Sequence, residues 1–282
     1  MAKLNLNQDI GTSNSEVVRL TELGNGVVQI TMKDEESRNS FSQSIVEGLR
    51  RCFGIVAQNQ DYKVVILTGY GNYFSSGASK EYLIRKTRGE VEVLDLSGLI
   101  LDCEIPIISA MQGHSFGGGL LLGLYADFVV LSQESVYTTN FMKYGFTPVG
   151  ATSLILREKL GTELAQEMIY TGENYRGKEL AERGIAIPVL PRQEVLNYAQ
   201  QLGQKIAKSP RLSLVALKQN LSAEMRAKFP EAVKKELEVH QVTFHQPEVA
   251  NRIQQEFSET IMPNWSQSTV EKETLPNSQP VQ

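Results

Sequence analysis

Two segments of this chain share one local order, an apolar strand followed by a loop, a glycine turn and a helix. They read KVVILTGYGNYFSSGAS (63–79) and PIISAMQGHSFGGG (106–119). Glycine lets the backbone approach a ligand closely, and the helix that follows each turn begins with unpaired N–H groups. If the two strands are neighbours, both turns can aim an N–H group at one point. That geometry is an oxyanion hole, which stabilises charge developing on a carbonyl oxygen.

The glycine triplet of the second segment does not match a nucleotide-phosphate motif. Its spacing is not GxGxxG, and no GK[ST] follows in GHSFGGGLLLGLYAD. Taken alone, the triplet is explained more simply by tight helix packing. The functional interpretation therefore depends on the two glycine turns together.

Strand and helix patterns alternate through the first half of the chain and predict an α/β fold with mostly parallel strands. Helical spacing of apolar residues covers 44–59, and residues 160–260 are mainly helical. We find no internal repeat. The expected strands are 26–32, 63–69, 106–113 and 127–132.

Composition shifts divide the chain into a core and three flanking parts. Residues 1–15 are polar and predict a flexible lead-in, which precedes a core over 16–200 and a helical region over 201–262. Residues 263–282 are polar and contain prolines, which is typical of a disordered tail. They fit an interdomain linker and a frayed terminus equally well.

The overall composition is that of an ordinary globular protein and excludes several classes of partner. The chain has 282 residues, 41% hydrophobic and 21% charged, with a net charge of −4. Mixed charges disfavour nucleic acid and anionic membranes as partners. No signal peptide or membrane span is apparent, and Cys52 and Cys103 have no metal-like spacing. We expect a cytoplasmic protein that holds no metal and no cofactor.

Over residues 16–260 the sequence resembles the crotonase (enoyl-CoA hydratase/isomerase) superfamily. The resemblance implies a crotonase fold with a repeated ββα core and a helical C-terminal trimerisation region, and therefore a homotrimer. It also implies a thioester substrate on coenzyme A or on the pantetheine arm of an acyl carrier protein. The matching stretches are RNSFS, FSSGAS, PIISAMQGHSFGGGLLLGLYAD, TPVGATSLILREKLG and TGENYRGKELAERGIAIPVL.

The family pattern places the oxyanion hole on the backbone N–H groups of Ala78 and Gly118. It also shows what this chain lacks, because two apolar residues, Leu121 and Phe141, occupy the positions of the two glutamates of a hydratase. Neither can activate water or move a proton, so we expect them only to line the pocket. Ser79 stands where many relatives have aspartate, which changes the contacts around the first turn.

An apolar pocket with an oxyanion hole suits decarboxylation, which needs an electron sink, a carboxylate contact and a proton donor. Lys86 and Tyr82 share one helical face beyond the first turn, with Lys86 about 12 Å of helical rise from Ala78. Pattern alone favours a solvated surface lysine. It likewise favours a half-buried structural role for His240, while His114 and His245 are expected at a strand end and a helix end.

Within the superfamily, the missing glutamates together with Lys86 and His240 resemble the decarboxylases of the polyketide β-branching (HMG-synthase) cassette, as in curacin-type synthase subunits. The resemblance implies conversion of 3-methylglutaconyl-acyl carrier protein to 3-methylcrotonyl-acyl carrier protein, with other polyketide synthase domains as possible neighbours. Lys86 and His240 are then the functional pair, and Tyr82 orients Lys86 or the substrate carboxylate.

Two alternatives remain open at the level of sequence. The first is a dehydratase or hydratase of the same cassette, acting on a 3-hydroxy-3-methylglutaryl thioester through other groups. The second is a non-catalytic crotonase-like scaffold that binds acyl carrier protein. The missing glutamates favour the scaffold, whereas the intact pair of glycine turns argues against it.

Overall fold

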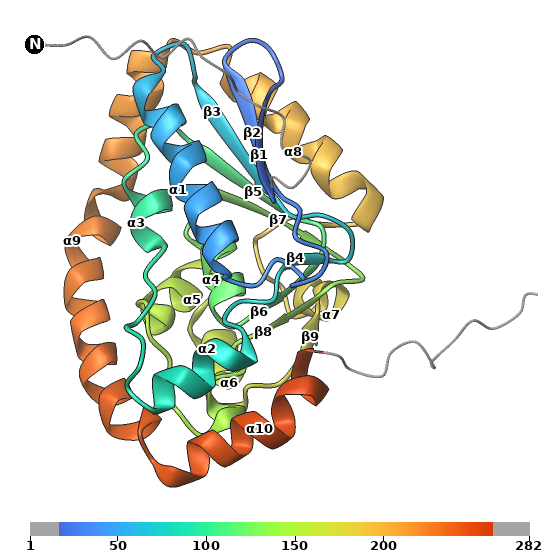
Figure 1. Ribbon diagram of the computed structural model, residues 1–282. Coiled ribbons are helices and arrows are strands. Elements are labelled where there is room, and N and C mark those ends of the chain that lie inside the picture. Colours follow the sequence, from blue (N-terminus) through green and yellow to red (C-terminus); the bar gives the residue numbers. More distant parts are fainter. Residues whose placement is uncertain (1–16, 262–282) are drawn as a thin grey trace, which may run out of the picture.

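The computed structural model describes residues 17–261 (Figure 1), with side chains described as far as residue 257. The expected lead-in over 1–15 and the expected tail over 263–282 lie outside the described residues. The expected boundary at residue 200 falls inside helix α8 (Arg192–Ile206).

A larger sheet of six strands runs through the middle of the fold, in the order β1-β2-β3-β5-β7-β10. β1 and β2 pair antiparallel, and all the other pairs are parallel, as the sequence predicts. The strands are β1 (Val18–Glu22), β2 (Val27–Met32), β3 (Val64–Thr68), β5 (Ile107–Met111), β7 (Phe128–Ser132) and β10 (Val189–Leu190).

A second, smaller sheet was not predicted, because strands of two or three residues carry no readable alternation. It comprises β4 (Tyr73–Ser75), β6 (His114–Phe116), β8 (Val136–Thr138) and β9 (Tyr175–Arg176), in that order. A strand of the larger sheet, a strand of the smaller sheet and a helix follow one another in β3-β4-α2 and again in β5-β6-α4. This is the repeated ββα core that the family resemblance implies.

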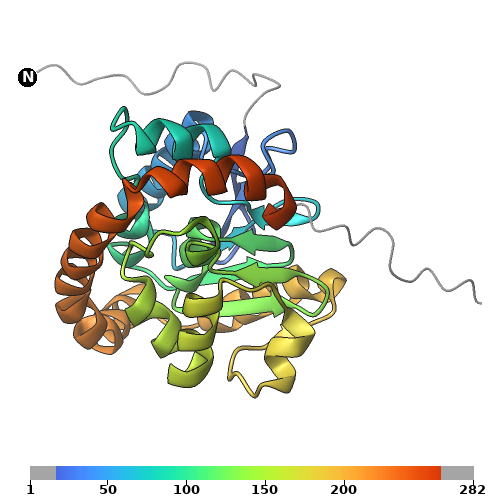
Figure 2. The ribbon, with the colours of Figure 1, turned by 90° about the horizontal axis from the view of Figure 1, so that it is seen from below.

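Helices cover both faces of the larger sheet, and the C-terminal helices extend around one side of the molecule (Figures 1 and 2). Within the region that the sequence predicts to be mainly helical, one long helix, α9, continues through Pro230. The helices are α1 (Gln43–Gln58), α2 (Lys80–Thr87), α3 (Ser97–Leu101), α4 (Gly118–Leu124), the 3₁₀ turn η1 (Met142–Tyr144), α5 (Thr152–Leu160), α6 (Thr162–Thr171), α7 (Gly177–Glu182), α8, α9 (Arg211–Phe244) and α10 (Pro247–Ile261).

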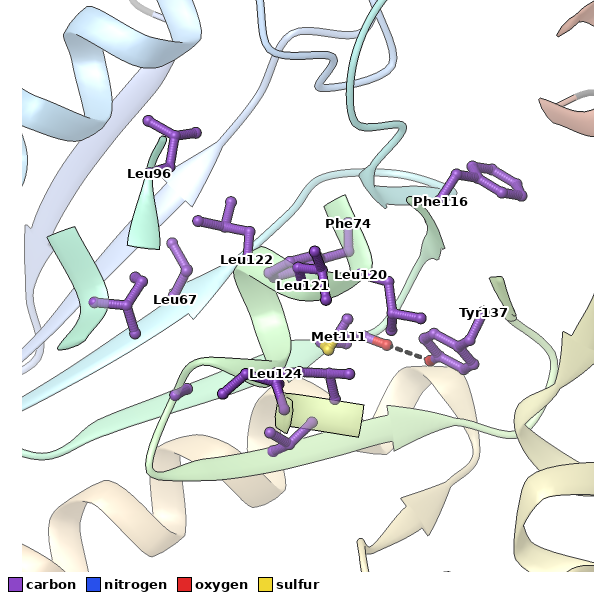
Figure 3. Packing of buried hydrophobic residues seen from close by; sticks show 14 of the residues in the cluster. Leu67, Phe74, Leu96, Met111, Phe116, Leu120, Leu121, Leu122, Leu124 and Tyr137 are labelled. Atoms are coloured by element: carbon purple, nitrogen blue, oxygen red, sulfur yellow. Dashed lines mark hydrogen bonds between the residues drawn. The ribbon is translucent and has the colours of Figure 1, made fainter. Parts of the chain in front are cut away.

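The core is built from the central strands and the leucine-rich helix α4. Every residue of β3 and β5 is buried, as expected for parallel strands covered on both faces. Figure 3 shows the leucines of α4 packed with Phe74 and Met111, and the Tyr137 hydroxyl donating to the Met111 carbonyl at 2.7 Å. Gly123 lies so close to Met111 that an added Cβ would come within 2.3 Å of its sulfur. This packing fixes α4, and with it the second glycine turn.

Candidate active site

The two glycine turns lie side by side because β4 and β6 pair in parallel, with Ser75 opposite Ser115. Gly77 adopts a left-handed conformation, with φ of +72°. A Cβ on Gly77 would lie 2.5 Å from the Phe116 carbonyl oxygen and 3.3 Å from the Gly118 nitrogen. Only glycine fits this contact, so Gly77 allows the turn before α2 to approach the turn before α4.

Two backbone N–H groups of these turns remain available for a ligand. Among residues 17–257, neither the Ala78 nor the Gly118 N–H donates a hydrogen bond to the protein, and both residues line one cavity. Ser79 caps α2 by accepting from the Tyr82 N–H, whereas α4 starts at Gly117 with no side-chain cap. The structure therefore brings Ala78 and Gly118 together as an oxyanion hole requires.

The cavity walls are largely aromatic and aliphatic. Phe141 is part of this wall, with its ring centroid 6.0 Å from that of Phe146. Leu121 is not among the cavity-lining residues, and the expectation that it lines the pocket is corrected here. Its side chain is buried in the core cluster beside the other α4 leucines (Figure 3). The apolar lining residues are Phe41, Leu83, Val93, Leu94, Phe116, Phe141, Tyr144, Phe146, Val149, Phe244 and Phe257.

Lys86 projects from α2 into this cavity and is only 8% exposed, which rules out a solvated surface lysine. Its Nζ lies 2.8 Å from Nε2 of His240 and 4.4 Å from the centroid of the Phe244 ring. Within the described part of the chain no carboxylate forms a salt bridge with Lys86. Burial lowers the pKa of Lys86 to about 8, so its ammonium form is easier to deprotonate than in water.

His240 comes from α9 of the same chain and is 2% exposed. Its Nδ1 lies 2.6 Å from the carbonyl oxygen of Thr147. A carbonyl only accepts, so Nδ1 carries the proton and Nε2 presents a lone pair to the Lys86 ammonium. Burial and the neighbouring charge of Lys86 lower the pKa of His240 to about 4. The imidazole is therefore neutral at pH 7 and accepts a hydrogen bond from Lys86.

Tyr82 lines the cavity, but the hydrogen bonds of its hydroxyl are formed with the backbone and not with Lys86. Its hydroxyl donates to the Glu92 carbonyl at 2.6 Å and accepts from the Leu94 N–H at 2.9 Å. Tyr82 therefore holds the segment 92–94 in place through two hydrogen bonds, and Val93 and Leu94 of this segment form part of the cavity wall. Helical spacing places Tyr82 and Lys86 on one face, but it does not reveal that each side chain has a different partner.

Sequence reasoning missed a polar pair in the cavity wall, Asn140 and Tyr144. The Asn140 amide donates to the Tyr144 hydroxyl at 3.1 Å. No motif in the sequence marks these two residues, because their proximity arises from the turn η1. Their four-residue spacing is the one signal that could have linked them.

The other two histidines lie outside the cavity, as expected. His114 is on β6, where its Nδ1 accepts from the Val136 N–H at 3.0 Å. His245 is exposed at the C-terminal end of α9. No group of His, Cys, Asp or Glu in the described part of the chain could hold a metal ion.

The arrangement combines four chemical features in one apolar cavity. Two free N–H groups can hold a thioester oxygen, and a buried ammonium can bind a carboxylate and later donate a proton. A neutral imidazole orients that ammonium. Among residues 17–257, no Asp or Glu side chain lines the cavity. Decarboxylation fits this set of groups better than hydration, which needs a base to activate water.

In the part of the chain that the structure describes, none of the helices combines the length and apolar character needed to span a membrane.

A family model described as enoyl-CoA hydratase/isomerase matches residues 22–268. The bacillaene synthase decarboxylase PksI of Bacillus subtilis (strain 168) is 49% identical over 239 residues, which cover 84% of this chain and 96% of that protein.

Two solved structures are similar to the chain. The ECH2 decarboxylase domain of CurF from Lyngbya majuscula is 88% identical with a TM-score of 0.85, and the match covers 86% of this chain and 100% of that domain. A structure from a dehydratase/decarboxylase enzyme couple involved in polyketide β-branching is 48% identical with a TM-score of 0.83, covering 85% of this chain and 95% of that one.

Proposed function

The chain belongs to the enoyl-CoA hydratase/isomerase family, and within it we propose that this protein is a decarboxylase of polyketide β-branch formation. The observation that carries the proposal is the contact between Lys86 and His240 in an apolar cavity that also contains the two free N–H groups. The names of the similar decarboxylases support the same activity. The proposed substrate is 3-methylglutaconyl-acyl carrier protein, and the proposed product is 3-methylcrotonyl-acyl carrier protein.

The reaction begins with the thioester held at one end and the carboxylate at the other. The Ala78 and Gly118 N–H groups bind the thioester oxygen, and Lys86 pairs with the distal carboxylate. The bond between that carboxylate and its neighbouring carbon breaks, carbon dioxide leaves, and the electron pair spreads into a dienolate that ends at the thioester oxygen. The oxyanion hole stabilises this charge as it forms.

Proton transfer completes the reaction. Carbon dioxide loss leaves the Lys86 ammonium facing the carbanionic end of the dienolate, to which it donates one proton. The apolar wall favours this step, because a low dielectric destabilises the charged ammonium. This lowers the pKa of Lys86 and makes its ammonium a stronger acid. One proton from solvent restores Lys86, so the net reaction consumes one proton for each carbon dioxide released.

The position of Phe141 argues against the hydratase alternative. The family pattern places a glutamate there in hydratases, whereas here the ring is packed against Phe146 in the cavity wall. The second glutamate position, Leu121, is buried in the core. Restoring hydration would require a carboxylate at both places.

Mass spectrometry of the acylated carrier protein tests the proposal directly. Incubation of 3-methylglutaconyl-carrier protein with the enzyme is expected to give a mass loss of about 44 Da, the carbon dioxide whose departure the oxyanion hole promotes. Lys86→Met should abolish the loss, and Lys178→Met, an exposed lysine on α7, is the matched control. Water loss from the 3-hydroxy-3-methylglutaryl substrate without carbon dioxide would indicate the dehydratase, and binding without turnover would indicate the scaffold.

A homotrimer and a cytoplasmic location belong to the same proposal. Exposed leucines on the first half of α9 support self-association, since apolar patches of this kind mark interaction sites. They are Leu212, Leu217 and Leu221. Sedimentation at several protein concentrations measures the assembly, and a species of a single chain would contradict the trimer.

A further inference from the structure

One face of α9 forms hydrogen bonds with the segment that leads from η1 into the first turn of α5, residues 147–153. Glu236, His240 and Thr243 follow one another at spacings of four and three residues, which places them on the same side of the helix. Each forms a hydrogen bond to this segment. The functional histidine is therefore the middle one of three contacts between α9 and the same stretch of chain.

Glu236 makes the most extensive of these contacts. Its two carboxylate oxygens accept from the Thr152 N–H at 3.0 Å and from the Ser153 N–H at 2.8 Å. The Ser153 hydroxyl adds a third hydrogen bond, at 2.6 Å. Helix α5 has no cap of its own, because Ala151 stands at its N-cap in a left-handed conformation. A glutamate from another helix thus supplies the negative charge that a helix N-terminus favours.

The other end of the segment is held by Thr243. Its Oγ1 accepts from the Thr147 N–H at 3.1 Å and shares a hydrogen bond of 3.0 Å with the Thr147 hydroxyl. The Thr147 carbonyl in turn accepts from Nδ1 of His240. The direction of that carbonyl decides which ring nitrogen of His240 carries the proton, and therefore whether Nε2 can accept from Lys86.

The second half of α9 depends on such anchors more than most helices do. Pro230 removes one backbone hydrogen bond inside the helix and disturbs the preceding turn. Beyond Pro230, His240 and Phe244 are the buried residues of α9, while Val239 and Val242 are exposed. Burial of apolar surface therefore contributes little to the placement of this half, and hydrogen bonds from its inner face contribute more.

We propose that Glu236 is a positioning residue for His240. By capping α5 it holds residues 147–153 against α9, which fixes the Thr147 carbonyl and keeps the Nε2 lone pair of His240 on Lys86. Glu236 is not among the cavity-lining residues, so it acts only through His240. The catalytic part of this inference rests on the proposed decarboxylase function, whereas the coupling between Glu236 and the His240 ring does not.

The test compares Glu236→Gln with Glu231→Gln, a matched change on the same helix where the carboxylate is exposed and pairs only with Lys235. For Glu236→Gln we expect kcat to fall about tenfold to a hundredfold with KM within about twofold, as misplaced catalytic groups give. Nitrogen NMR of the His240 ring should change from one tautomer with Nδ1 protonated to a mixture. Glu231→Gln should alter neither quantity.

Thr243→Val and Thr243→Ser provide a second pair, which serves also if Glu236→Gln folds poorly. The valine variant should mix the His240 tautomers and lower kcat, and the serine variant should restore both. The proposal is overturned if His240 keeps a single tautomer, or if kcat stays unchanged, in folded Glu236→Gln or Thr243→Val. Absence of carbon dioxide release by the unaltered protein would remove the proposed function instead, while the NMR comparison would still decide whether Glu236 positions His240.

Discussion

Two buried lysines of this protein have opposite surroundings. Lys218 on α9 is 6% exposed, and its Nζ lies 2.8 Å from an Asp127 carboxylate oxygen and 3.0 Å from the Ile105 carbonyl oxygen. Lys86 is about as buried, yet its neighbours are the neutral imidazole of His240 and the face of the Phe244 ring. Lys218 has a compensating charge, and Lys86 has none among residues 17–257.

Under the proposed function, this difference separates a structural lysine, Lys218, from a catalytic one, Lys86. A buried charge with a partner links the two elements that carry the groups. Here these are α9 and the loop that leads into β7. A buried charge without a partner costs stability, and such groups concentrate at functional sites. Burial alone therefore identifies neither role, and the nature of the neighbour does.

The largest expected effect separates the two lysines by activity. Lys86→Met should lower the rate of carbon dioxide release by about 10²- to 10⁴-fold, the usual contribution of a general acid. Lys218→Met should leave the rate per folded molecule unchanged, because its Nζ is bound to Asp127 and Ile105, outside the cavity. Single-turnover assays on the carrier-bound substrate measure both. Equal losses of rate in the two variants would show that Lys86 has no catalytic role that Lys218 lacks.

The next effect separates them by stability. Lys218→Met leaves the Asp127 carboxylate without its cation and should lower the free energy of unfolding by about 3 kcal/mol, the low end for breaking a buried pair. The low end applies because a quarter of the Asp127 side chain is exposed. Denaturant unfolding gives the value, and a Lys218→Met/Asp127→Asn double variant should recover part of it. An unchanged free energy of unfolding in the single variant would show that the pair contributes no net stability.

The same substitution at Lys86 should have the opposite sign. The pKa of Lys86 lies at about 8 in the folded protein and near its ordinary value in the unfolded chain, so the folded state disfavours the ammonium. Lys86→Met should therefore stabilise the protein at pH 7 by about 3 kcal/mol. The gain should be complete below pH 8 and disappear as the pH rises from there to the ordinary lysine pKa. A destabilised variant at pH 7 would mean that the ammonium is compensated in some other way.

The smallest effect concerns pH. If the Lys86 ammonium is the proton donor, the rate should be level below its pKa of about 8 and fall about tenfold for each pH unit above it. A lowered pKa means that the acid form is lost at lower pH than for an exposed lysine. Steady-state rates between pH 6 and 10, at about half-unit steps around the pKa, would measure the curve. A rate that rises through this range would assign Lys86 the role of a base.

The local order of the chain, and the chemistry that it excludes, follow from residues that are close together in the sequence. Short stretches of sequence are enough to predict three features. They are the alternating strands and helices, the glycine turns at Gly77 and Gly117, and the apolar residues at two glutamate positions. These features are local, since they depend on periodicity, backbone freedom and side-chain type. They were enough to identify the α/β fold and to propose the oxyanion hole.

Which side chains come into contact depends on how distant parts of the chain pack together. The contact between Lys86 and His240 joins residues that are 154 positions apart in the chain, and this spacing does not predict the contact. The same holds for Tyr82, whose hydroxyl binds the segment 92–94, and for Leu121, which faces the core instead of the cavity. Long-range packing sets the burial of each group, and burial decides whether a lysine stays a surface cation or becomes an acid at about pH 8.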